Sequence, residues 1–262
     1  MKSLLDDHGL AVPALVGDFA DVPPAVAGPA AYLERLRLHL DACRDLGTPR
    51  LRVDTVSPSP GPPEGADADG ALARVAEVWR RAAEEAAGAG VELVWEFEAA
   101  FRFNAPSEIV RLVQAVGHPA FTVLFDFFHA FCCAVLGARQ RGGREVLAGG
   151  VEELAAMLAG RIGLVHWSDA AHGPGGPPGV PGTRVAFGAG ELDLDAATRA
   201  VLAAGYDGAW WSIDLGALCP DALAAAPAAK RFMDGLVARV GGKPADGRDG
   251  AGEERAARPR RG

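Results

Sequence analysis

The apolar segment VLFDFFHA, residues 123–130, contains two residues that are costly to bury, Asp126 and His129. A carboxylate inside a protein needs a partner that compensates for its lost hydration. Three other apolar segments also carry acidic or imidazole side chains near their C-terminal ends. They are VELVWEFE with Glu96 and Glu98, RIGLVHWSD with His166, and AWWSIDL with Asp214. These groups gain a common chemical role if the fold brings them together.

Alternation along each segment separates the polar groups from an apolar face. In residues 91–98 the odd positions are large and apolar from Leu93 onwards, so Glu96 and Glu98 share the opposite face of a strand. The same alternation sets apart Asp126, His166 and Asp214. In a closed barrel of parallel strands, the C-terminal strand ends converge on one mouth. The pattern therefore predicts that Glu96, Asp126, His166 and Asp214 are neighbours.

Three carboxylates and one imidazole at one mouth require a compensating positive charge. A divalent metal ion supplies it, and a set rich in oxygen with one histidine favours Mn²⁺ or Mg²⁺, with Co²⁺ or Zn²⁺ as further candidates. Taken singly, each acidic residue is also explained as a helix cap or salt-bridge partner, and the histidine as a structural residue. The agreement of four strand ends is what favours the metal site.

Four further residues are candidates for contact with a substrate. His129 follows Asp126 closely, Glu98 shares the face of Glu96, and His172 lies in the loop after His166. Trp210 lies on the same alternation as Asp214, where an indole ring would offer an apolar face to a sugar; packing against the core explains it equally well.

The elements that position these residues alternate along the chain. Strands are expected at 11–17, 51–56, 91–98, 121–127, 161–169 and 209–215. Amphipathic helices are expected between them, at 29–46 and 70–87 among others, because apolar residues recur there every three or four positions. Alternating strands and helices predict an α/β fold with a parallel sheet. The Gly/Pro-rich segment 172–184 is read as a loop.

Composition excludes several classes of protein. The 262 residues carry a formal net charge of −8, which disfavours nucleic acid as a partner. No segment has the roughly 20 consecutive apolar residues of a membrane span, and the N-terminal residues MKSLLDDHGLAV lack the long apolar core typical of a signal peptide. With four cysteines read as reduced thiols, we expect a cytoplasmic protein. Residues 1–240 form the expected domain, and the polar segment 241–262 is predicted to be a disordered tail.

Several motifs together resemble the sugar phosphate isomerase/epimerase family, the xylose isomerase-like TIM barrels. They are GVELVWEFEAAFRFNAPSEIVRLVQAVGHPAFTVLFDFFHA, RIGLVHWSDA, AFGAGELDLDA and GYDGAWWSIDL. The resemblance covers roughly residues 50–240. It implies a (β/α) TIM-type barrel in which Glu96, Asp126, His166 and Asp214 are the metal ligands and His129 contacts the substrate.

The chain departs from the family pattern at several places. The last strand ends in Asp214 where the family usually has Glu, and Arg184 and Ala189 replace a usual His and Glu around the glycine turn. The family's first two strands have no counterpart, so about six of eight strands are expected and the barrel is incomplete at the N-terminus. Open strand edges invite association, so a homo-oligomer is one expected state.

The resemblance implies a metal-dependent isomerase or epimerase of a small sugar or polyol. The reaction would pass through an enediolate, with Glu96 and Asp214 transferring the proton. Three alternatives remain open. A dehydratase or other lyase acting on a keto-inositol would use the same site, a phosphodiesterase of the endonuclease IV type would need more histidines and a basic surface, and a degenerate barrel would bind without catalysis.

Overall fold

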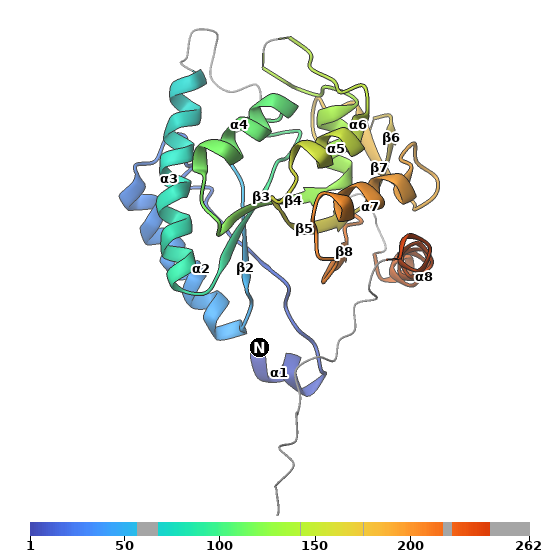
Figure 1. Cartoon of the computed structure of the whole chain (residues 1–262). Helices are drawn as coiled ribbons and strands as arrows, with labels where there is room; N and C mark the ends of the chain where they lie inside the picture. Colours follow the sequence, from blue (N-terminus) through green and yellow to red (C-terminus); the bar gives the residue numbers. More distant parts are fainter. Residues whose placement is uncertain (57–67, 142, 175, 217–221, 242–262) are drawn as a thin grey trace, which may run out of the picture.

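A computed structural model describes residues 1–56, 68–141, 143–174, 176–216 and 222–241. Six parallel strands form a single sheet in the order β1-β2-β3-β4-β5-β8, and the sheet curls into a half-barrel with helices around it (Figure 1). The strands are β1 (Leu15–Val16), β2 (Arg50–Val53), β3 (Glu92–Glu96), β4 (Phe121–Asp126), β5 (Ile162–Trp167) and β8 (Trp211–Ile213). The predicted incomplete (β/α) barrel of six strands is therefore confirmed.

Most helices follow strands along the chain and bury an apolar face in the main hydrophobic core, whereas the first helix precedes every strand and has no buried residue. Their bounds are α1 (Lys2–Asp7), α2 (Pro29–Leu46), α3 (Ala68–Gly88), α4 (Pro106–Val116), α5 (Phe127–Ala134), α6 (Gly150–Met157), α7 (Leu194–Ala203) and α8 (Ala222–Val240). Helix α2 shows how local residues define the start and the end of a helix. Pro29 occupies its first turn, where no backbone donor is needed, and Gly47 ends it in the left-handed conformation.

One element differs from expectation. Residues 172–184, read as a loop, contribute to an antiparallel hairpin of β6 (Asp169–His172) and β7 (Gly182–Val185). Its two short strands are joined across a Gly/Pro-rich connection, so no alternation in the sequence marks them. The hairpin lies between β5 and α7 in the chain and places Arg184 beside the C-terminal ends of the strands.

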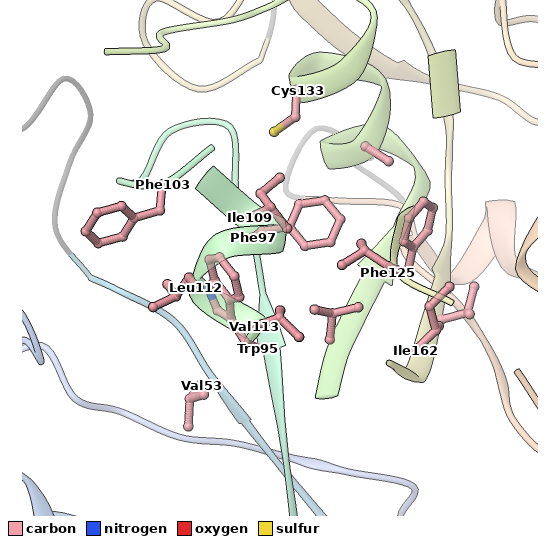
Figure 2. Packing of buried hydrophobic residues seen from close by; sticks show 14 of the residues in the cluster. Val53, Trp95, Phe97, Phe103, Ile109, Leu112, Val113, Phe125, Cys133 and Ile162 are labelled. Carbon is pink, nitrogen blue, oxygen red and sulfur yellow. The ribbon is translucent and has the colours of Figure 1, made fainter. Parts of the chain in front are cut away.

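The main hydrophobic core lies between the sheet and the helices. An aromatic wall faces the helices and consists of Trp95 on β3, Phe97 just after β3, and Phe125 on β4. The rings of Trp95 and Phe97 meet edge to face with their centroids 6.1 Å apart, and the rings of Phe97 and Phe125 do so at 5.7 Å. Ile109 and Leu112 of α4 pack onto this wall, as Figure 2 shows. The apolar face predicted from odd-numbered positions is thus the face that anchors the helices.

The inner face of the half-barrel has a small apolar layer of its own. Val94, Leu124 and Leu164 form a separate buried cluster, with Ala14 and Trp210 packed against it. Because side chains alternate, the residues two positions before and two positions after this layer on the same strands are expected to face inward as well. The layer therefore divides the inner face into an N-terminal end and a C-terminal end.

The last described helix, α8, ends at Val240. The division into a domain of residues 1–240 and a tail stays a prediction. The predicted tail, residues 241–262, falls almost entirely outside the described residues. No helix in the described part of the chain is long and apolar enough to cross a membrane.

Candidate metal centre

The structure brings together the four residues predicted as metal ligands. Glu96 ends β3, Asp126 ends β4, His166 lies near the end of β5, and Asp214 directly follows β8. These strands are consecutive neighbours in the sheet. One ligand atom from each side chain lies within 4.8 Å of the other three. The four donors therefore form one cluster at the C-terminal end of the inner face.

Asp126 is fully buried and is oriented by neighbours on two elements. It is the N-cap of α5, where its Oδ1 accepts the backbone N–H of His129 at 2.9 Å. The Ser168 hydroxyl donates to the same oxygen at 3.2 Å. These contacts leave Oδ2 directed toward the cluster, 3.8 Å from His166 Nδ1. One carboxylate thus serves as helix cap and as ligand candidate, so the two interpretations are compatible.

His166 and Glu96 approach closely without forming a well-aligned hydrogen bond. His166 Nδ1 lies 3.2 Å from Glu96 Oε1, yet that nitrogen is buried without a hydrogen-bond partner among the described residues. Two donor atoms that share a cation at about 2.0–2.2 Å each are separated by about 3 Å. The spacing, the unpartnered nitrogen and the oxygen-rich donor set therefore fit a divalent cation.

Electrostatics within the cluster follow from its crowding. Burial disfavours the charged imidazole of His166, but Glu96, with Asp126 and Asp214, outweighs burial and raises its pKa. Burial also opposes the charge of Glu96, and His166 together with Arg52 overcomes this and lowers the pKa of that carboxyl. Against the effect of burial, Arg184 and the neighbouring histidines lower the pKa of Asp126 as well. Glu96 and Asp126 are accordingly ionised at neutral pH, which is the form that binds a metal.

Arg184 supplies one of the compensating charges. Its Nη2 donates to Asp126 Oδ2 at 3.1 Å and to Asp214 Oδ2 at 2.7 Å. The guanidinium carbon lies 4.3 Å from the ring centroid of Phe128, a cation–π contact that fixes its position. The sequence showed Arg184 only as a departure from a motif. Its role was missed because β7, which carries it, was not expected.

Arg52 supplies the other compensating charge from β2. Its Nε donates to Glu96 Oε2 at 2.7 Å, its Nη1 lies 2.6 Å from Asp54 Oδ2, and its Nη2 donates to Glu98. Burial raises the pKa of Asp54. Sequence reasoning missed both Arg52 and Asp54. The signal was present, because Asp54 ends a strand-like segment as Asp126 does.

Glu98 and His129 border the cluster. Burial and the charge of Glu96 raise the pKa of Glu98 to about 7, against the opposing effect of Arg52. Burial lowers the pKa of His129, which is therefore neutral at pH 7. The backbone N–H of Ala99 donates to His129 Nδ1 at 3.4 Å, so the ring proton is assigned to Nε2. Both residues are polar groups positioned beside the candidate ligands.

The other two predicted contact residues lie elsewhere. His172, with 59% of its side chain exposed, is paired through Nδ1 with Glu191 at 2.7 Å, and the structure does not bring it into the cluster. Trp210 packs against the inner apolar layer, below the level of the carboxylates. Wall packing therefore accounts for Trp210 as well as a sugar contact does.

A glycine turn beyond β7 is held by a buried carboxylate that the sequence reading did not single out. Asp169 Oδ2 accepts the backbone N–H groups of Gly188 at 2.8 Å and Gly190 at 3.0 Å. A Cβ at Gly190 would lie 2.0 Å from Asp169 Oδ1, so the close approach requires glycine. Asp169 thereby fixes the path of the chain between the hairpin and α7.

Comparison with solved structures shows the fold shared with sugar epimerases. An L-ribulose 3-epimerase superposes with a TM-score of 0.67 at 20% identity, covering 91% of this chain and 79% of that one. A D-allulose 3-epimerase from Methylomonas sp., in complex with D-allulose, gives 0.66 at 20% identity, with 90% and 80% covered. An AP endonuclease, family 2, from Brucella melitensis gives 0.57 at 19% identity, with 82% and 75% covered. At these identities the likeness concerns the fold.

Sequence comparison gives the family. No curated protein matches the chain at a significant level. The sequence profile of the xylose isomerase-like TIM barrel matches residues 1–235, which includes every strand of the sheet and all four residues of the cluster. This chain therefore belongs to the xylose isomerase-like TIM barrel family.

Proposed function

We propose that the protein is a divalent-metal-dependent isomerase or epimerase of a small sugar or polyol. The observation that carries this proposal is the convergence of Glu96, Asp126, His166 and Asp214 within 4.8 Å at the ends of four neighbouring strands. Such a donor set fits Mn²⁺ or Mg²⁺ best. The sugar epimerases among the structural neighbours support the same reaction class.

A bound divalent cation would polarise the substrate carbonyl and lower the energy of the charge that develops on its oxygen. The chain's own residues then move the proton. In the proposed reaction, Glu96 takes the proton from the carbon next to the carbonyl, which leaves an enediolate. Asp214, at the opposite end of the cluster and carrying a proton taken from solvent, gives that proton to the neighbouring position or to the other face of the same carbon, and Glu96 releases the abstracted proton to solvent.

The bordering residues have simpler proposed roles. His129 is neutral, and its Nε2 proton can be donated to a substrate hydroxyl. Glu98 offers a carboxyl group to another hydroxyl and remains held by Arg52. His172, bound to Glu191 on the hairpin, stays a candidate only for the outer edge of a substrate.

Turnover in D₂O tests this function directly. A panel of free ketoses, supplied with MnCl₂, is expected to include a substrate that acquires deuterium at the carbon next to the carbonyl. Glu96→Gln should lower kcat by at least about 100-fold, because general-base catalysis contributes about 10²–10⁴-fold. Manganese occupancy is measured on the same samples, so that loss of the base is separated from loss of the metal.

Glu92→Gln is the matched control, because Glu92 lies on the same strand and the same inner face, four residues before Glu96. This variant should retain the wild-type kcat. Turnover without deuterium incorporation and without a primary isotope effect at that C–H bond would refute proton transfer. Product analysis also detects the dehydratase alternative, in which loss of water accompanies proton removal.

A second candidate, a non-catalytic barrel, is favoured by one observation. Arg184 already bridges Asp126 and Asp214, so part of the negative charge is compensated within the chain. A chain that binds less than about 0.1 equivalent of Mn²⁺ at millimolar metal, a tenth of the single equivalent expected for one such site, would support this reading and contradict the enzyme.

A further inference from the structure

We infer that Arg52 is a positioning residue that holds one carboxylate oxygen of Glu96 and so presents the other to the metal centre. This inference deepens the proposed function and rests on it. It assigns a role to β2, a strand that contributes none of the four candidate ligands.

The two oxygens of Glu96 face different partners. Oε2 accepts from Arg52 Nε at 2.7 Å, whereas Oε1 lies 3.2 Å from His166 Nδ1. With Oε2 engaged, the carboxylate cannot rotate about its terminal bond without losing a charge-assisted hydrogen bond. Glu96 is thereby presented to the candidate ligands through a single oxygen, Oε1.

Arg52 is itself held on all sides of its planar head. Asp54 lies 2.6 Å from Nη1, and Glu98 accepts from Nη2. Asp54 is fixed in turn, because its Oδ1 accepts the backbone N–H of Val56 at 2.8 Å. A guanidinium offers its donors in a rigid fork, so three engaged carboxylates define its orientation. The position of Glu96 thus depends on a network anchored on β2.

The Arg50–Glu92 pair offers a comparison that separates the positioning role proposed for Arg52 from ordinary ion pairing. Arg50 lies two residues earlier on the same strand and pairs with Glu92 at 3.1 Å. Its side chain is 16% exposed, against 12% for Arg52. The second oxygen of Glu92, however, accepts from the Thr122 hydroxyl at 2.7 Å. Both carboxylate oxygens of Glu92 therefore have partners, whereas Arg52 leaves one oxygen of Glu96 facing the candidate ligands.

Cobalt titration of the full chain tests the inference, because the visible absorption of bound Co²⁺ reports ligand geometry independently of turnover. The variants are Arg52→Met, Arg52→Lys and, as matched control, Arg50→Met. Both methionine variants remove a partly buried, ion-paired arginine from β2 and should lower thermal stability. Of the two methionine variants, only Arg52→Met should alter the Co²⁺ spectrum, and it should lower kcat by about 10–100-fold, as expected for loss of a group that orients a ligand. Arg52→Lys, which can hold one carboxylate but not three, should give an intermediate spectrum and kcat.

Defined outcomes overturn the inference. Identical Co²⁺ spectra for wild type and Arg52→Met would refute it, as would equal spectral changes in Arg52→Met and Arg50→Met. A wild-type chain that binds no Co²⁺ would refute it as well. If wild type binds Co²⁺ but turns over no ketose, the proposed function fails, while the spectral comparison still decides the role of Arg52.

Discussion

The two ends of the inner face of the half-barrel are built from the same strands but differ in their charge balance. At the N-terminal end, Arg50 pairs with Glu92, whose other oxygen accepts from Thr122. At the C-terminal end, carboxylates outnumber cations. The carboxylates there are Asp54, Glu96, Glu98, Asp126 and Asp214, and the cations are Arg52, Arg184 and, when protonated, His166.

This difference indicates that the N-terminal end of the inner face contributes to stability, whereas the C-terminal end is suited to chemistry. In barrels of parallel strands, residues at the N-terminal face serve the fold and those at the C-terminal face serve catalysis. The layer of Val94, Leu124 and Leu164 separates the two ends. At the N-terminal end, both oxygens of Glu92 already have partners in Arg50 and Thr122. At the C-terminal end, the excess of negative charge favours binding of a cation. The comparison yields predictions that contrast substitutions at the two ends.

The largest contrast concerns metal binding. Asp126→Asn should lower Mn²⁺ affinity by at least about 100-fold, because a carboxylate ligand is replaced by a neutral amide. Glu92→Gln should leave it unchanged. Isothermal titration calorimetry of both variants, with circular dichroism as a check of folding, measures the difference. Equal affinities in the two variants would show that the acidic end is no metal site.

A smaller contrast is expected in thermal stability on addition of metal. At a free Mn²⁺ concentration of about 100 times Kd, binding stabilises the folded state by about 2.7 kcal/mol. For a chain of this size that corresponds to a rise in Tm of roughly 5–11 °C. Differential scanning calorimetry should show the rise in wild type and in Glu92→Gln, and its loss in Asp126→Asn. A similar rise in Asp126→Asn would place the bound metal elsewhere.

The smallest effect belongs to the N-terminal end of the inner face. Thr122→Val removes the hydroxyl that donates to Glu92 at 2.7 Å and keeps the shape of the side chain. We expect a loss of about 1 kcal/mol in the free energy of unfolding, the usual contribution of one hydrogen bond. Urea denaturation measures this loss, and Mn²⁺ affinity should stay at the wild-type value. A marked change in metal affinity would mean that the apolar layer does not insulate the two ends.

The four candidate metal ligands and helix α2 could be predicted from single segments of the sequence. Alternation within a strand depends only on neighbouring residues, so Glu96, Asp126, His166 and Asp214 could each be assigned to the inner face without knowledge of the fold. The Pro29–Leu46 helix was predicted at its observed bounds, because apolar spacing and Gly47 both mark it.

What the sequence did not reveal depends on contacts between segments. Arg52 and Arg184 reach their carboxylates across strands and across the hairpin, and no spacing along the chain encodes those distances. Helix α5, Phe127–Ala134, is buried on every side and so shows no polar face to mark it. Charge compensation by arginine was therefore invisible, and the sequence alone pointed to a metal as the sole counter-charge.

The strand order carries a consequence for how the chain folds. In the sheet, each strand pairs with its predecessor among β1, β2, β3, β4, β5 and β8. A closed barrel must also pair its first strand with its last, a contact that spans the whole domain and costs the most loop-closure entropy. Within the described residues β1 and β8 are not paired. Structure can thus be added strand by strand from the N-terminus, in the order in which a ribosome delivers it, without waiting for a final ring closure.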